Sequence, residues 1–176
     1  MWNEIWEVVR QEFADVPDAG ELTRLLVRLG LAMLLGAAIG YERESRDSSA
    51  GLRTHMLVAL GTAIFVLVPL QAGMNADGMS RVIQGLIAGI GFLGAGTVIK
   101  HSHSGEIHGL TTAAGIWATA AIGMTVGMGR ETTAIISTVF VLVILSVLLR
   151  LERYIVPETE GRDDVSPEEK RREHDS

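Results

Sequence analysis

The sequence contains no cysteine, and aromatic residues make up only 5% of its 176 positions. The missing cysteines exclude disulfide bonds, thiol catalysis and cysteine-based zinc sites. Positive charge is not in excess either, because 21 acidic residues outnumber 15 lysines and arginines. A basic surface for binding nucleic acid is therefore not expected.

Motifs of common catalytic and nucleotide-binding sites are absent as well. The sequence has no Gly-x4-Gly-Lys-Ser/Thr loop, no Ser-His-Asp order and no His-Glu-x-x-His pair. Its glycine-rich runs lie inside hydrophobic stretches, not between a strand and a helix where they would bind a phosphate. We therefore predict that this protein is not an enzyme.

Hydrophobic residues are abundant, filling 48% of the sequence and gathering in long runs. A helix needs about 20 residues to cross a bilayer core of about 30 Å. Four such runs carry no charge apart from His55 at one edge. A fifth run, from Leu25 to Tyr41, has Arg28 in its first turn, from which its side chain can reach the headgroups. Buried helices of a soluble protein would show a polar stripe, and these runs do not. We predict an all-α, polytopic membrane protein with five transmembrane helices at residues 22–41, 54–74, 82–99, 109–128 and 132–150.

The flanking regions differ from these spans. Residues 1–20 alternate Trp2, Ile5 and Trp6 with acidic residues at helical spacing, which predicts an amphipathic helix in the membrane interface; a frayed terminus is the alternative. They lack the basic start of a cleaved signal peptide. Residues 21–153 form the predicted transmembrane domain, and the charged residues 154–176 are expected to be a disordered cytoplasmic tail.

Lysines and arginines near the span ends predict the orientation in the membrane. The loops after the first and third spans, together with the tail, contain six of these residues, and the loops after the second and fourth spans contain two. Positive residues favour the cytoplasmic side, so the first group is placed inside. Arg10, Arg24 and Arg28 on the outer side weaken this asymmetry. We expect the amino terminus outside and the carboxyl terminus in the cytoplasm.

The sequence also contains an internal repeat. Residues 34–65 align without a gap with residues 92–123 after a shift of 58, and eight of the 32 positions are identical. A shared abundance of Ala, Leu and Gly is the alternative explanation. In each copy a polar loop precedes Gly-Leu-x-Thr, with Thr54 or Thr112 at the start of the next helix. Two crossings separate equivalent points, so both loops are expected on one face of the membrane.

Glycines are numerous inside the predicted spans, although each costs a helix up to about 1 kcal/mol relative to alanine. Close approach of helix backbones explains them. We therefore place the glycine-rich third span at the centre of the bundle; a pore or a broken helix is the alternative. Arg81 and Gln84 share one face of its outer end, where we expect them to close the bundle. The predicted packing glycines are Gly36, Gly40, Gly85, Gly89, Gly91, Gly94 and Gly96.

The first polar loop concentrates charge at the membrane border. Its predicted functional residues are Glu42, Arg43, Glu44, Arg53, Thr54 and His55. Charges in such a place are costly unless they are paired, so one interpretation is an ion-pair network that fixes the loop. The other is a site for a substrate anion or a divalent cation, because carboxylates such as Glu42 and Glu44 suit Mg²⁺.

The second polar loop has different chemistry at the equivalent place. Its predicted functional residues are His101, His103, Glu106 and His108, followed by Thr111 and Thr112 at the helix start. Three imidazoles and a carboxylate can bind Zn²⁺, Ni²⁺ or Cu²⁺. A solvated histidine-rich loop is the interpretation we favour, because a tight zinc signature is missing. Histidines titrate near pH 6, so a pH-responsive role is a further hypothesis.

Together these motifs resemble the MgtC/SapB family of bacterial inner-membrane proteins over about residues 22–148. The resemblance rests on Glu42-Arg43-Glu44, Ala50 to His55, Arg81 with Gln84, Gly89 to Gly96, and Gly109 to Ala114 with Trp117. It implies a five-span inner-membrane protein linked to magnesium homeostasis, to survival of pathogens inside phagocytes and, in some members, to inhibition of the F-type ATP synthase. It also adds Trp117 to the residues expected in the helix packing. Roles of the folded carboxyl-terminal domain of longer members are not carried over to the charged tail.

Two functions are consistent with these residues. We favour a non-enzymatic regulator of magnesium or ion homeostasis, a homo-oligomer in the lipid bilayer that contacts a membrane partner such as the F-type ATP synthase. The alternative is a small transporter or channel for a divalent cation or a metabolite. A transport path needs polar groups inside the membrane, and here these are mainly threonines, Gln84 and charges at the edges. Mg²⁺ is the candidate cofactor, although the residues require none.

Overall fold

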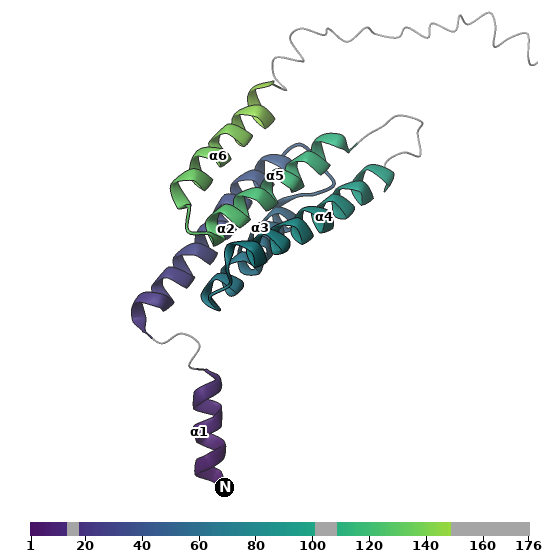
Figure 1. Cartoon of the computed structure of the whole chain (residues 1–176). Coiled ribbons are helices and arrows are strands. Elements are labelled where there is room, and N and C mark those ends of the chain that lie inside the picture. Colours follow the sequence, from purple (N-terminus) through teal and green to yellow (C-terminus); the bar gives the residue numbers. More distant parts are fainter. Residues whose placement is uncertain (14–17, 101–108, 149–176) are drawn as a thin grey trace, which may run out of the picture.

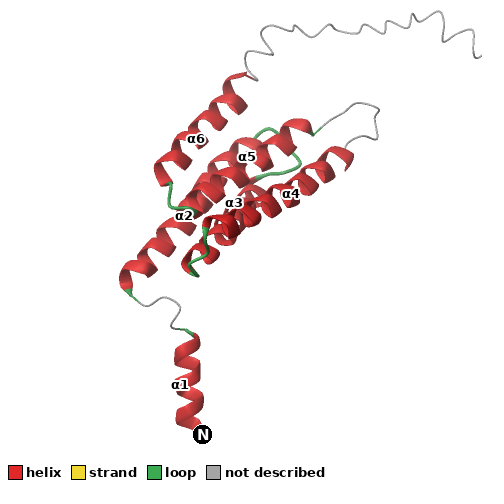
Figure 2. Ribbon diagram, in the orientation of Figure 1, coloured by secondary structure: helices red, strands yellow, loops and turns green. Residues whose placement is uncertain are grey.

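A computed structural model describes residues 1–13, 18–100 and 109–148, and every regular element in them is a helix (Figures 1 and 2). The helices are α1 (Trp2–Glu12), α2 (Ala19–Glu44), α3 (Leu52–Gln71), α4 (Ala76–Lys100), α5 (Leu110–Gly127) and α6 (Glu131–Val143), which continues as a π-helical turn, η2 (Ile144–Leu148). The predicted all-α fold is confirmed.

Four helices, α2 to α5, are long and apolar enough to cross a membrane. The fifth predicted span corresponds to the shorter α6 with η2, and its positions 149 and 150 lie outside the described residues. Predicted and observed limits agree within a few residues, except that α4 begins at Ala76 and not at Val82. The Asn75 side chain explains this early start, because it accepts a hydrogen bond from the Gly78 amide (2.9 Å) as an N-cap.

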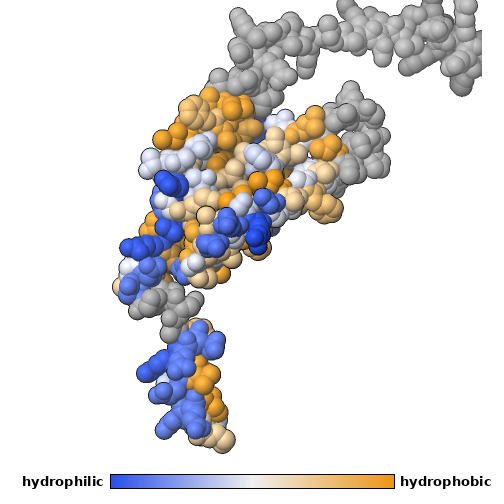
Figure 3. Space-filling view, in the orientation of Figure 1, coloured by the Kyte–Doolittle hydropathy of each residue, from blue (hydrophilic) through white to orange (hydrophobic). Residues whose placement is uncertain are grey.

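The amino-terminal helix α1 is amphipathic. Figure 3 shows a hydrophilic side and a hydrophobic side, and none of its residues is buried. Asp18 then caps α2 by accepting a hydrogen bond from the Glu21 amide (2.7 Å). Residues 14–17 and the predicted tail, residues 154–176, lie outside the described part of the chain. The position of α1 in the membrane interface stays a prediction.

The centre of the bundle is α5, which contacts α2, α3, α4 and α6. Half of its most apolar stretch is buried, compared with only 6% for α4. The expectation that the third span, now α4, takes the centre is therefore wrong. Close contacts explain the difference: a Cβ on Gly123 of α5 would overlap the Ala59 carbonyl oxygen, and a Cβ on Gly127 would lie 2.6 Å from that of Ala63.

The two hairpins of the repeat, α2–α3 and α4–α5, make one equivalent contact. A Cβ on Gly36 would lie 2.7 Å from the His55 carbonyl oxygen, and a Cβ on Gly94 would lie 3.5 Å from the Ala113 Cβ; both pairs are related by the shift of 58. Gly40 approaches the Leu52 Cα as closely, but its counterpart is Val98. The larger valine side chain does not permit that approach, so the second hairpin is looser than the first.

The ends of α2 and α4 and the starts of α3 and α5 lie at the same end of the bundle, here called the loop end (Figure 1). The hydroxyls of Ser48, in the first loop, and Thr112, at the start of α5, lie 3.0 Å apart and join the two hairpins there. The predicted placement of the two turns at one face is confirmed for the helix ends that the structure describes.

At the opposite end, Arg28 of α2 ties three helices together. Its Nε lies 3.4 Å from a carboxylate oxygen of Glu131, the first residue of α6, and its Nη1 donates to the Gly127 carbonyl of α5 (3.5 Å). The charge that interrupts the first predicted span therefore has protein partners.

Candidate functional site

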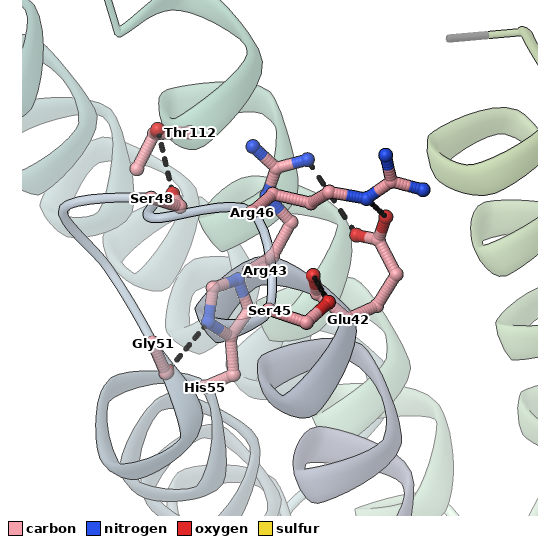
Figure 4. A network of polar contacts seen from close by, with 8 residues as sticks. All are labelled: Glu42, Arg43, Ser45, Arg46, Ser48, Gly51, His55 and Thr112. Atoms are coloured by element: carbon pink, nitrogen blue, oxygen red, sulfur yellow. Dashed lines mark hydrogen bonds and ion pairs between the residues drawn. The ribbon is translucent and has the colours of Figure 1, made fainter. Parts of the chain in front are cut away.

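Near the end of α2, the Glu42 carboxylate lies between two arginines (Figure 4). Its Oε2 is 3.5 Å from Arg43 Nη1, and its Oε1 is 3.4 Å from Arg46 Nε, one helical turn further along. The side chains of Glu42 and Arg43 are only 11% and 8% exposed. This geometry is that of the ion-pair network considered for the first loop. Two guanidinium groups around one carboxylate leave the cluster with a net positive charge.

Glu44 has a different partner. Its Oε2 accepts a hydrogen bond of 2.7 Å from the Leu52 amide, at the start of α3. The N-cap residue of α3 is Gly51, which has no side chain to do this. A Cβ on Gly51 would lie 2.8 Å from the same carboxylate oxygen, so the glycine leaves room for it. Glu44 therefore caps α3 from the preceding helix, and its negative charge is favourable at that helix start.

The two carboxylates do not converge on a cation. Glu42 contacts arginines and Glu44 contacts a backbone amide. Within residues 1–13, 18–100 and 109–148, no group of three or more His, Asp or Glu side chains is arranged to hold a metal ion. The predicted Mg²⁺ site at Glu42 and Glu44 thus finds no support in this geometry. The residues of the second loop, His101, His103, Glu106 and His108, lie outside the described part of the chain.

His55 is fully buried in the first turn of α3. Its Nδ1 lies 3.0 Å from the Gly51 carbonyl oxygen (Figure 4), and since a carbonyl only accepts, Nδ1 carries the proton. The other ring nitrogen, Nε2, faces Gly115 of α5, where a Cβ would lie 3.4 Å away. The glycine therefore makes space for the imidazole between α3 and α5.

Several buried polar atoms of this cluster have no hydrogen-bond partner among the described residues. They are both carboxylate oxygens of Glu42, Nε and Nη1 of Arg43, and Nε2 of His55. The contacts of Glu42 with the arginines are ion pairs at distances too long for strong hydrogen bonds. The cluster of Glu42, Arg43 and His55 at the loop end is thus polar and largely buried, with hydrogen-bonding capacity that the described side chains leave unused.

The first loop also borders a polar cleft of about 490 Å³. The lining residues are Glu44, Ser48, Gly51, Leu52, Arg53 and Thr54. Arg53 is exposed, Thr54 is half-buried, and at the start of α5 Thr111 is exposed while Thr112 is buried. Sequence reasoning missed Arg46 and Ser48 as members of the site. The spacing of four between Glu42 and Arg46 is a signal that could have identified the former, whereas nothing local marks Ser48.

The predicted packing residues divide into two groups. Gly36, Gly40 and Gly94 are buried in contacts between helices. The others are exposed and do not form a core within one chain, which corrects the prediction for Arg81, Gln84, Gly85, Gly89, Gly91, Gly96 and Trp117. A Cβ on any of these four glycines would meet nothing within 4 Å. Trp117 is equivalent in the repeat to Ala59, and the tight packing around that alanine has no room for an indole.

The sequence matches the model of the MgtC family over residues 29–154. The chain belongs to the MgtC family. Among curated relatives of this MgtC family member, Protein SrpB of Synechococcus elongatus is 45% identical over 145 residues, which cover 76% of this chain and 80% of SrpB. The putative magnesium transporter YhiD of Escherichia coli K12 is 40% identical over 133 residues, covering 72% of this chain and 61% of YhiD. No solved structure matches.

Protein MgtC of Salmonella typhimurium is 41% identical over 125 residues, covering 71% of this chain and 52% of its own length. The MgtC family member described here therefore spans just over half of that relative. The matched region contains the whole candidate site, from Glu42 to Thr112. The resemblance to the MgtC/SapB family is confirmed, and with four helices of membrane-spanning length the chain is a multi-pass bacterial membrane protein.

Proposed function

We propose that this MgtC family member acts in magnesium homeostasis in the bacterial inner membrane as a non-enzymatic regulator. The relation to magnesium is supported by the name of one relative, the putative magnesium transporter YhiD. Family membership does not distinguish a regulator from a transporter. The interior of the bundle is what favours the regulator.

Beyond the Glu42, Arg43 and His55 cluster at the loop end, the described interior is apolar. The core consists of small and aliphatic side chains: Ala32, Ile39, Ala59, Ala63, Ile122, Val126, Ala134 and Leu145. The buried hydroxyls of Thr62, Thr119 and Thr138 each donate to a carbonyl of their own helix, at 2.8 Å. Mg²⁺ gives up its hydration water reluctantly and prefers oxygen ligands. A Mg²⁺ ion that crossed this apolar interior would lose its hydration water without gaining oxygen ligands in its place. The lack of ligands along the described interior is the observation that favours the regulator.

The regulator acts through contacts with other membrane proteins, and the loop end is the surface that we assign to them. The Glu42, Arg43 and Arg46 cluster and the Glu44 cap hold the first loop in one conformation, so that Arg53 is presented from a fixed position. In the orientation with the amino terminus outside, this surface faces the cytoplasm. A membrane partner such as the F-type ATP synthase contacts it there, and the protein itself is a homo-oligomer.

Two measurements test the regulator against the transporter. Proteoliposomes containing the purified protein are assayed for Mg²⁺ and H⁺ flux. In parallel, growth at limiting Mg²⁺ is measured in a host that lacks its own family member and expresses the parent, Glu42→Gln or Arg53→Ala. We expect no flux above empty liposomes, and growth support by the parent that both variants lose. Glu7→Gln on the exposed helix α1 serves as the matched charge control and should behave like the parent.

Saturable Mg²⁺ flux in the parent that disappears in Glu42→Gln and Arg53→Ala would overturn the regulator and establish the transporter. If both variants supported growth at limiting Mg²⁺ as well as the parent does, the loop end would have no role in this function.

A further inference from the structure

A groove between α5 and α6 opens on the outer surface of the bundle, along the half of α5 that is nearest the loop end. Its volume is about 430 Å³. Small residues line it on the α5 side, and larger aliphatic residues line it on the side of α6 and η2. These residues are Ala114, Gly115, Ala118, Val141, Ile144 and Leu145. Leu110 and Thr111 complete the lining at the loop end. We call this feature the α5–α6 groove.

The α5–α6 groove is long and narrow. Between Leu110 and Ala118, α5 rises by about 12 Å, which is most of the about 15 Å that one leaflet adds to the hydrocarbon core. Spread over this length, the volume of the groove gives a mean cross-section of about 36 Å². A helix about 10 Å wide needs about 80 Å² and is therefore too wide for it. Because Leu110 and Ile144 on its two sides are exposed and apolar, a single hydrocarbon chain fits the groove.

The loop end of the groove lies level with Glu42 of α2. Arg28 of α2 contacts Glu131, the first residue of α6, and both helices continue from there towards the loop end (Figure 1). Fourteen residues further along each helix, close to four turns, stand Glu42 and Leu145, so these two residues lie at one level. Leu145 lines the groove and also belongs to the apolar core that includes Ile39 of α2. Since Arg28 and Glu42 stand on the same side of α2, that side faces α6 here as well.

Arg46 places a positive charge at this end of the groove. It stands one turn beyond Glu42, its Nε lies 3.4 Å from the Glu42 carboxylate, and its side chain is 28% exposed, so an anion can reach it. Figure 4 shows its two terminal nitrogens directed away from that carboxylate, and they take part in no ion pair with the residues that the structure describes. Glu44 does not compensate this charge, because its carboxylate accepts from the Leu52 amide at the start of α3. An apolar groove thus ends at a guanidinium whose donors are available for an anion.

We propose that the α5–α6 groove binds one anionic phospholipid from the leaflet at the loop end. One acyl chain lies between α5 and α6, and the phosphate pairs with the terminal nitrogens of Arg46. The two parts of the site match the two parts of this ligand, because an apolar groove of nearly leaflet depth ends at a cation. Guanidinium and phosphate form paired hydrogen bonds, and basic pockets between transmembrane helices suit anionic headgroups. The site goes beyond the proposed function and does not depend on whether the protein regulates or transports.

Native mass spectrometry of the purified full-length protein measures the bound lipid. The protein in mild detergent is given equal amounts of phosphatidylglycerol and phosphatidylcholine with the same acyl chains. We expect one phosphatidylglycerol per chain, preferred about fivefold over phosphatidylcholine, which is the effect of one basic residue near an anionic headgroup. Arg46→Gln should remove this preference, and Arg46→Lys should keep most of it. An excess of inorganic phosphate should not displace the lipid, because free phosphate gains nothing from the groove.

Filling the groove separates the contribution of the acyl chain from that of the headgroup. Ala114→Leu adds bulk inside the α5–α6 groove and should weaken the binding of both lipids several-fold. Gly61→Leu is the matched control, since Gly61 lines a comparable apolar groove of about 510 Å³ between α3 and α4, and its lipid binding should equal that of the parent. Circular dichroism checks that both variants are folded. Phosphatidylglycerol with a photoreactive acyl chain gives a second readout without any substitution, and the labelled peptides should come from α5 and α6.

Five results would overturn the proposal: no preference for phosphatidylglycerol in the parent, a preference that survives Arg46→Gln, displacement of the lipid by inorganic phosphate, equal losses in Ala114→Leu and Gly61→Leu, or photolabelling mainly on α3 and α4. If Ala114→Leu does not fold, Arg46→Gln and the photolabel decide. All of these results are read from lipid binding, so they are separate from flux and growth, which test the proposed function.

Discussion

Gly123 of α5 lies directly against the backbone of Ala59 of α3, so closely that a Cβ on the glycine would overlap the alanine carbonyl oxygen. One turn later, Gly127 repeats this contact with Ala63. Both helices thus present small residues four positions apart, the spacing that lets membrane helices touch. Since α3 belongs to the first hairpin of the repeat and α5 to the second, this contact holds the two hairpins together.

Adding one methyl group at this contact should separate the helices. We expect Gly123→Ala to lower the free energy of unfolding by about 1–3 kcal/mol, the usual cost of an overpacked core. Gly61→Ala is the control, because a Cβ there meets nothing within 4 Å. It should be neutral or stabilising by up to about 1 kcal/mol, since alanine favours a helix. Unfolding in detergent micelles, followed by circular dichroism, measures the free energy of unfolding of both variants. Equal changes in Gly123→Ala and Gly61→Ala would contradict the close contact at Gly123.

The cap that Glu44 provides can be separated from its charge. Glu44→Ala removes the acceptor of the Leu52 amide, and we expect a loss of about 1 kcal/mol, typical of a lost helix cap. Glu44→Gln keeps an acceptor oxygen and should lose less. Hydrogen exchange of the amides at the start of α3 is the direct measurement, with Glu7→Ala on α1 as control. If these amides exchanged no faster in either variant than in the parent, Glu44 would not cap α3.

Arg43 and Arg46 contact the same carboxylate but differ in burial, with side chains 8% and 28% exposed. Breaking a buried ion pair costs about 3–5 kcal/mol, whereas an exposed pair contributes about 0–1 kcal/mol. We therefore expect Arg43→Ala to destabilise the protein by about 3 kcal/mol and Arg46→Ala by about 1 kcal/mol or less. Chemical unfolding in micelles compares the two. If Arg46→Ala proved the more harmful, the burial described for Arg43 would be wrong.

The placement of both turns at one end of the bundle predicts a pattern of chemical labelling. Cysteines introduced at the exposed Ser49 and Thr111 should react with a membrane-impermeant maleimide from the same side of sealed vesicles. A cysteine at the exposed Asn75, before α4, should react only from the other side. Vesicles of known orientation also test the predicted cytoplasmic position of the loops. Labelling of Ser49 and Thr111 from opposite sides would contradict the parallel repeat.

Part of the candidate site was accessible from local patterns. The charged residues of the first loop are adjacent in sequence, so their presence at one membrane border follows from span counting alone. Their partners do not follow from it. Glu42 and Glu44 are chemically alike and only two residues apart, yet one lies between arginines and the other caps a helix. That difference depends on the path of the loop, which brings Leu52 back to Glu44 and Ser48 to Thr112.

The sequence by itself determined the helices, their approximate limits and the common end of the two repeat loops, because the length of an apolar run and the direction of a repeat are properties of the chain alone. Only the tertiary structure decided that α5, and not the glycine-rich α4, lies at the centre. A glycine permits close approach but does not select the helix that approaches. Here Gly123 and Gly127 meet alanines of α3. In α4, Val98 stands where α2 has Gly40. The side chains opposite each glycine therefore decide which helix contacts form.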